Sequence, residues 1–72
     1  PRGAAPGALT GRETEVLRLV ADGLTNREIA ARLVISQATA ARHVANCFAK
    51  LGAHSRAEAT RLAVERGLLA TA

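Results

Sequence analysis

The sequence predicts an all-α domain of four short helices, with the second and third helices forming a helix-turn-helix. Apolar residues recur at helical spacing, and no stretch alternates as a half-buried strand would. Ser or Thr followed three residues later by Glu, a typical helix start, occurs three times. The chain is rich in Ala, Leu and Arg, with Phe48 as its only aromatic residue, and this composition favours helices over strands.

The first eight residues differ from the rest of the chain. Residues 1–8 hold two Pro and two Gly without any hydrophobic period, which is typical of a flexible linker. We therefore expect a linker remnant at 1–8 and one small domain at 9–72, cut from a longer protein because the chain begins with Pro1 rather than Met.

Two capping boxes define the first pair of helices. Thr10 with Glu13 predicts a helix over 11–22, which ends before Gly23. Thr25 with Glu28 predicts a second helix over 26–33.

Similar capping residues predict the second pair of helices. Ser36 is expected to cap a helix over 37–51, and the link from Val34 to Ser36 is expected to be a short, partly buried turn. Ser55 with Glu58 reads as a third capping box, which predicts a helix over 56–66.

One apolar face of each helix is expected to form the core. The predicted core residues are Val16, Leu17, Val20, Ile29, Ala30, Leu33, Ala40, Val44, Cys47, Leu51, Ala59, Leu62 and Ala63, with Leu19 on a flank and Leu24 packing onto Ile29.

Composition excludes several classes of protein. The longest uncharged stretch of the patterned region, Leu33 to Ala41, has nine residues, whereas a membrane-spanning helix needs roughly 20. Cys47 is the only cysteine, so the chain forms no internal disulfide and fits a reducing cytoplasm. We expect no membrane association and a cytoplasmic location.

The formal net charge of +4 is confined to the middle of the chain. Acidic and basic residues cancel within 1–28 and again within 58–72, whereas 29–57 contains four cations and no acid. A basic segment between neutral ones is typical of polyanion binding, although an excess of Arg on a solvated face would give the same count.

The predicted helix over 37–51 has an unusual exposed surface. Opposite its core stripe lie small residues around one Arg, and a flank of hydrogen-bond donors borders them: Ala38, Arg42, Ala45 and Ala49, then Thr39, His43, Asn46 and Lys50. Slim side chains with donors along the edge suit a helix that enters the major groove of DNA.

Metal binding and catalysis are not expected. His43 and Cys47 are four residues apart and His54 lies nearby, but there is no second cysteine to complete a zinc site. Cys47 is better interpreted as a small core residue, and the sequence contains no phosphate-binding loop or nucleophile motif. We therefore expect neither a cofactor nor enzyme activity.

Two alternative functions remain open. A basic helical domain can also bind an acidic partner protein, but a groove for a partner helix should be lined by large apolar residues. A promoter-reading domain of a sigma factor would also read DNA with its third helix. Sigma-factor domains lack the ordered pattern found here, which is Leu9-Thr10, Arg12-Glu13 and Lys50-Leu51-Gly52.

This pattern resembles the LuxR-type, or GerE-type, helix-turn-helix domain over about residues 9–66. The matching residues are Leu9-Thr10, Arg12-Glu13, Glu15-Val16-Leu17, Gly23-Leu24-Thr25-Asn26, Glu28-Ile29-Ala30, Leu33, Ile35-Ser36, Thr39, His43-Val44, Asn46, Lys50-Leu51-Gly52 and Ser55-Arg56. The resemblance implies a DNA-reading third helix, dimerisation through the fourth and a role in bacterial transcription control. The chain departs from the family at Ala40, where Val is usual, at Ala41, where Lys is usual, and at Cys47, where Ile is common.

The domain is expected to bind double-stranded DNA through a helix-turn-helix over about 26–45. Base edges are expected to meet Arg42, Ala38 and Ala45. Phosphates are expected to meet Thr25, Asn26, Ser36, Thr39, His43, Asn46 and Lys50.

The last predicted helix carries a second stripe of small and apolar residues, which faces away from the core. It comprises Ala57, Thr60, Val64 and, if the helical turn continues past Gly67, Leu68. With the dimerisation that the resemblance implies, we expect a weak homodimer through this stripe. RNA polymerase is a further candidate partner.

Overall fold

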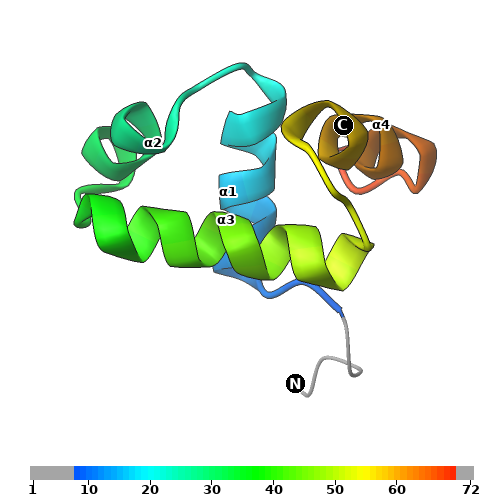
Figure 1. Ribbon diagram of the computed structural model, residues 1–72, viewed down its shortest axis with the longest axis horizontal. Helices are drawn as coiled ribbons and strands as arrows, with labels where there is room; N and C mark the ends of the chain where they lie inside the picture. The colour runs from blue at the N-terminus through cyan, green and yellow to red at the C-terminus, as the bar shows by residue number, and fades with distance from the viewer. Residues whose placement is uncertain (1–7, 70–72) are drawn as a thin grey trace.

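The computed structural model describes residues 8–69, which form four helices and no strand. They are α1 (Gly11–Ala21), α2 (Asn26–Leu33), α3 (Gln37–Leu51) and α4 (Arg56–Glu65) (Figure 1). The all-α prediction is confirmed, and α1 and α4 each end one residue earlier than expected. The linker expected at 1–8 lies, apart from Ala8, outside the described residues.

Side-chain caps begin α1 and α2 as the sequence predicts. The Thr10 hydroxyl oxygen accepts a hydrogen bond from the Glu13 amide at 3.1 Å, and the Thr10 amide donates to Glu13 Oε1 at 2.9 Å. Thr25 and Glu28 repeat this geometry at 3.1 and 2.8 Å. Each box satisfies two backbone groups that a helix start otherwise leaves unpaired.

Only one of the two hydrogen bonds of the third predicted capping box forms. Ser55 Oγ accepts from the Glu58 amide at 3.0 Å, as expected. The Glu58 carboxylate, however, accepts from the amide of His54 at 2.6 Å rather than from that of Ser55. The backbone at Ser55 is more extended, with φ −158°, than at the caps Thr10 and Thr25, where φ is about −75°.

The core occupies the space that the four helices enclose. Its buried apolar residues are the predicted ones together with Leu19, except that Leu33 and Leu62 are half-buried and pack, like Leu24, against the core from its edge. Four of the fully buried residues, Ala40, Cys47, Ala59 and Ala63, are small, and Leu17 and Ile29 are the largest side chains among them.

The turn between α2 and α3 differs from the expectation at one residue. Val34 ends α2 in the left-handed conformation, with φ 57°, and is 88% exposed, whereas Ile35 is half-buried against the core. The Ile35 amide donates to the carbonyl of Ala30 at 3.0 Å. This reversal turns Ile35 inward and Val34 outward, although a β-branched residue at positive φ is strained.

The chain also reverses after α4. Gly67 has φ 68°, and the Leu68 amide donates to the carbonyl of Ala63 at 2.9 Å. The condition for placing Leu68 in the outer stripe of α4, a helical turn that continues past Gly67, is not met, and Leu68 packs against the core.

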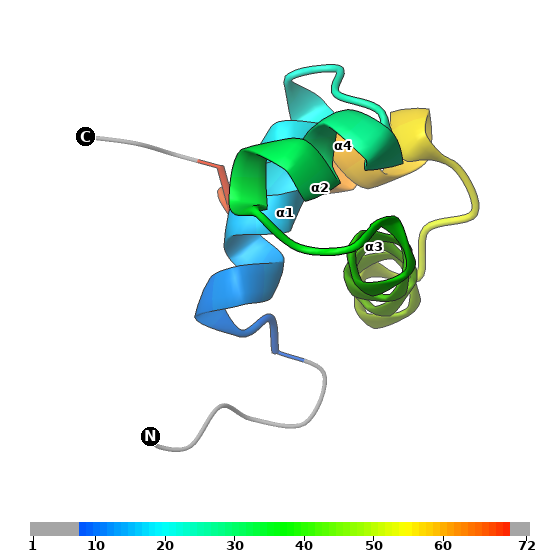
Figure 2. The ribbon, with the colours of Figure 1, turned by 90° about the vertical axis from the view of Figure 1, so that its left-hand side faces the viewer.

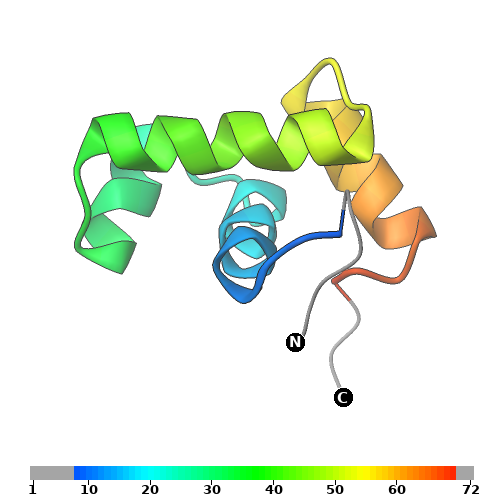
Figure 3. The same ribbon diagram turned by 90° about the horizontal axis from the view of Figure 1, so that it is seen from below.

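Helix α3 lies along one edge of the described part of the chain. In Figure 3 it runs across the top of the molecule, with α1, α2 and most of α4 below it, while the segment between α3 and α4 rises above its right-hand end. Figure 2, which views α3 end-on, shows the same separation. One long side of α3 is thus left uncovered by the other described helices.

Candidate nucleic-acid interface

The uncovered side of α3 carries the residues predicted to read bases. Ala38, Arg42 and Ala45 are exposed, whereas Ala40 and Val44 are buried on the opposite side. A 15-residue helix is roughly 22 Å long, and the major groove, about 12 Å wide, admits a helix whose exposed side chains are small. The three residues therefore form one slim face with a single cation at its centre, which we call the reading face.

The predicted phosphate contacts on α3 divide into two groups. Asn46 is exposed, and Thr39 and His43 are half-buried beside the reading face. Lys50 is also half-buried, but its ammonium group points toward α1. The structure thus places three of these side chains along the edge of the reading face and Lys50 apart from them.

The two hydroxyl groups at the start of α3 bond to each other. Ser36 Oγ accepts from the Thr39 amide at 3.0 Å and donates to Thr39 Oγ1 at 2.9 Å. The Ser36 proton is thereby used within the protein, and the Thr39 hydroxyl keeps its own proton to donate.

The start of α2 is joined to the start of α4 by Arg56. Its guanidinium donates to Asn26 Oδ1 at 3.1 Å and to the carbonyl oxygen of Leu24. Because Asn26 uses its oxygen in this bond, its amide nitrogen is left as the donor group. Thr25, which accepts from Glu28, likewise keeps its hydroxyl proton.

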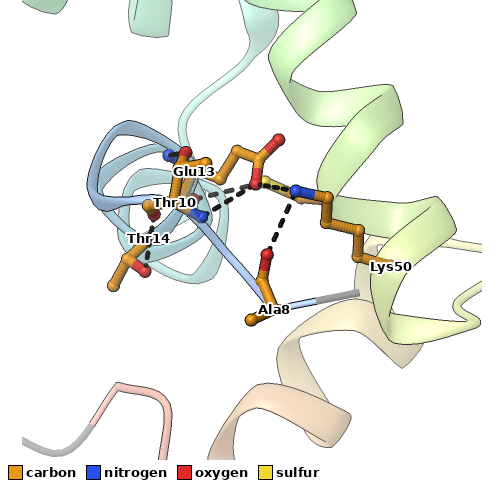
Figure 4. A network of polar contacts seen from close by, with 6 residues as sticks. Ala8, Thr10, Glu13, Thr14 and Lys50 are labelled. Carbon is orange, nitrogen blue, oxygen red and sulfur yellow. Dashed lines mark hydrogen bonds and ion pairs between the residues drawn. The ribbon is translucent and has the colours of Figure 1, made fainter. Parts of the chain in front are cut away.

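Lys50 takes part in a polar network with α1 (Figure 4). Its Nζ lies 2.7 Å from Glu13 Oε1 and 3.1 Å from the carbonyl oxygen of Ala8. The Glu13 side chain is only 8% exposed, and the pKa of its carboxyl group is lowered by the bond from Lys50 and by those from Thr10.

Sequence reasoning missed both of these long-range contacts. Glu13 and Lys50 are 37 positions apart, and Asn26 and Arg56 are 30 apart, so no helical period joins them. The available signal was that the basic segment 29–57 has no acid of its own, so that a buried partner for any of its cations had to come from another helix.

The charge of the basic segment is therefore distributed unevenly. Lys50 is neutralised by Glu13, and Arg56 bonds to α2. Arg32 and Arg42 are the exposed cations that remain among the four in this segment. Within the reading face and its edge, Arg42 is the residue that offers full positive charge to an anion.

Cys47 behaves as the core residue that the sequence suggests. It is fully buried, and its thiol donates to the carbonyl oxygen of Glu13 at 3.2 Å. Burial, together with the nearby Glu13 carboxylate, raises the pKa of the Cys47 thiol to about 11. Within residues 8–69 no three His, Cys, Asp or Glu side chains gather closely enough to hold a metal ion.

Comparison with known proteins identifies the family. The family described as "Bacterial regulatory proteins, luxR family" matches residues 7–63. The chain belongs to this LuxR family. Membership makes it a DNA-binding helix-turn-helix domain of transcription regulators and supports neither the protein-interaction module nor the sigma-factor alternative.

Two relatives of this LuxR-family domain are named as response regulators. It is 49% identical over 59 residues to the "Nitrate/nitrite response regulator protein homolog" of Haemophilus influenzae, covering 82% of this chain and 28% of that protein. It is 42% identical over 67 residues to the "Uncharacterized response regulatory protein YgeK" of Escherichia coli, covering 93% of this chain and 46% of that protein.

A solved structure shows the same fold. The crystal structure of the response regulator ChrA, from a heme-sensing two-component system, superposes with a TM-score of 0.81 at 40% identity. The match covers 94% of this chain and 32% of that one, so the LuxR-family domain spans less than half the length of the relatives described here. In the described residues no helix is long and apolar enough to cross a membrane.

Proposed function

We propose that this domain binds specific double-stranded DNA sequences as the effector domain of a longer bacterial transcription regulator that acts in the cytoplasm. Helix α3 enters the major groove, and the helix-turn-helix of about 26–45 holds it there. The observation that carries this proposal is the reading face: small exposed side chains on either side of Arg42, on the uncovered side of α3.

Arg42 is the proposed base-reading residue. Its guanidinium can donate two parallel hydrogen bonds to O6 and N7 of a guanine, a geometry that distinguishes guanine from the other bases in the major groove. Ala38 and Ala45, one turn away on either side, would lie close to neighbouring bases and contact thymine methyl groups.

The proposed phosphate contacts frame the reading face. At the starts of α2 and α3, helix dipoles and donor groups favour an anion, and Thr25, Asn26, Ser36 and Thr39 belong to these two helix starts. His43 and Asn46 extend the set along α3. The predicted phosphate contact by Lys50 is left out of this set, because the Lys50 ammonium group bonds to Glu13.

A weak homodimer through α4 is the proposed arrangement on DNA. Ala57 and Val64 are exposed on this helix, Val64 at 65%, and Thr60 is half-buried beside them. Small residues let two helices approach closely, and one helix pair buries little area, so pairing is expected to depend on DNA. Leu68 packs against the core, so an interface role for it has less support.

RNA polymerase is a proposed partner of the bound dimer.

A salt series tests the proposed function. Each neutralised phosphate contributes about −0.9 to the slope of log affinity against log salt, so several phosphate contacts should give a slope of roughly −3 to −6. Fluorescence anisotropy of a labelled duplex, titrated with the domain at several salt concentrations, measures this slope. A flat response, or no binding at low salt, would contradict DNA binding.

A further inference from the structure

The contacts of Lys50 are the strongest feature that the reading face does not explain. Lys50 is a cation on the DNA-reading helix, yet two of its three ammonium protons point to Glu13 Oε1 and to the carbonyl oxygen of Ala8. The Lys50 side chain is 30% exposed and that of Glu13 is 8% exposed. Glu13 also accepts from the Thr10 amide through the same oxygen, so the pair is built into the first turn of α1.

Moving Lys50 to a phosphate would break this arrangement. The Glu13 carboxylate would remain buried without its cation, and an uncompensated buried charge is strongly unfavourable. A phosphate contact at the protein surface is solvated and screened by salt, so it offers less in return. The electrostatic balance therefore keeps Lys50 on Glu13 when the domain meets DNA.

Two contacts on neighbouring turns fix the rotation of α3 against α1. Cys47 Sγ donates to the backbone carbonyl of Glu13 at 3.2 Å, and Lys50 Nζ reaches the side chain of the same residue at 2.7 Å. A helix held at two successive turns cannot rotate about its axis without breaking one of the bonds. The direction in which Arg42 points depends directly on that rotation, because residues on a helix are set 100° apart.

We propose that Glu13 and Lys50 are positioning residues for DNA binding, which set the rotation of α3 and so the orientation of its reading face, while Lys50 makes no phosphate contact. This inference rests on the proposed function. It predicts that an acid on α1 favours DNA binding, although a negative charge near a polyanion would ordinarily oppose it.

The test compares Glu13→Gln with Glu15→Gln, using the 72-residue chain. Both variants remove one acidic charge from α1, but the Glu15 side chain is 55% exposed and pairs with Arg12 rather than with α3. Gln is tolerated at position 13 because a Gln also completes a capping box. Circular dichroism and thermal unfolding identify the temperature range in which all variants are folded.

Affinity is measured for a duplex selected from a random pool and for a random duplex, each over a salt series. Glu13→Gln is expected to lower affinity for the selected duplex roughly three- to tenfold relative to Glu15→Gln, and Lys50→Met by a similar factor relative to the unmodified chain, each with an unchanged salt slope. The ratio of selected to random affinity should fall as well. The double variant should be no weaker than the weaker single variant, because both changes break the same pair. Lys50→Arg, which keeps the positive charge, should retain most of the affinity that Lys50→Met loses.

Three results would overturn the inference. An increase in affinity for Glu13→Gln beyond the Glu15→Gln control, with a steeper salt slope, would mean that Glu13 withholds Lys50 from a phosphate. A salt slope about one unit shallower for Lys50→Met would assign Lys50 directly to the backbone of DNA. Lower melting temperatures with unchanged selected-to-random ratios would leave the pair only a structural role. Failure of the unmodified chain to bind any duplex would instead refute the proposed function.

Discussion

Val64→Glu is expected to abolish cooperative binding to two inverted half-sites while leaving the fold and the binding of a single half-site intact. Val64 is 65% exposed on α4, so the core does not depend on it. In a two-fold dimer through α4, the substitution places two like charges near the axis. One helix pair buries little area, and this contact between the two domains is the source of the cooperativity, so without it each half-site should be bound with single-site affinity.

The measurement compares duplexes that carry one half-site or two, spaced about one helical turn apart. Arg12→Gln is the matched control, because it changes the net charge by the same amount at an exposed position on α1. Circular dichroism should be unchanged in both variants. Cooperative binding that survives Val64→Glu would place the dimer contact elsewhere than α4.

Arg42→Ala should give the second largest effect. Loss of a bidentate contact with guanine is expected to cost about 1–3 kcal/mol on the selected duplex and to relax the preference at one base pair. Arg32→Ala is the matched control, since Arg32 is also exposed but lies on α2, away from the reading face. The control should weaken selected and random duplexes about equally. The same uniform loss for Arg42→Ala would show that Arg42 meets a phosphate and not a base.

Local signals explain why the helix starts could be predicted. Each begins at a Ser or Thr whose hydroxyl oxygen accepts from the amide three residues later, and such contacts lie within one turn of sequence. The core faces were predictable for a related reason, because the 3.6-residue period places apolar side chains on one side of each helix.

The remaining features depend on contacts that periodicity does not encode. Val34 adopts a left-handed conformation that glycine usually provides, and nothing in its side chain signals it. The reversal at Gly67 removed Leu68 from the predicted outer stripe of α4. Within the candidate site, the exposure of Arg42 followed from its helical position, whereas the bonds of Lys50 and Arg56 depend on how the helices pack.

The packing also explains one departure from the family pattern. Where the resemblance makes Ile common, this chain has Cys47, whose buried thiol donates to the Glu13 carbonyl. An Ile side chain has no donor for this bond. The cysteine thus exchanges apolar volume for a contact between α3 and α1.

Amide chemical shifts of the domain test most directly whether α3 and the start of α2 form the surface that binds DNA. Spectra with and without a short duplex should differ mainly at residues 36–46 and at Thr25 and Asn26, with the changes reversing as salt is added. Shifts concentrated on the outer face of α1 or on α4, with residues 36–46 unaffected, would contradict DNA binding through α3 and the start of α2.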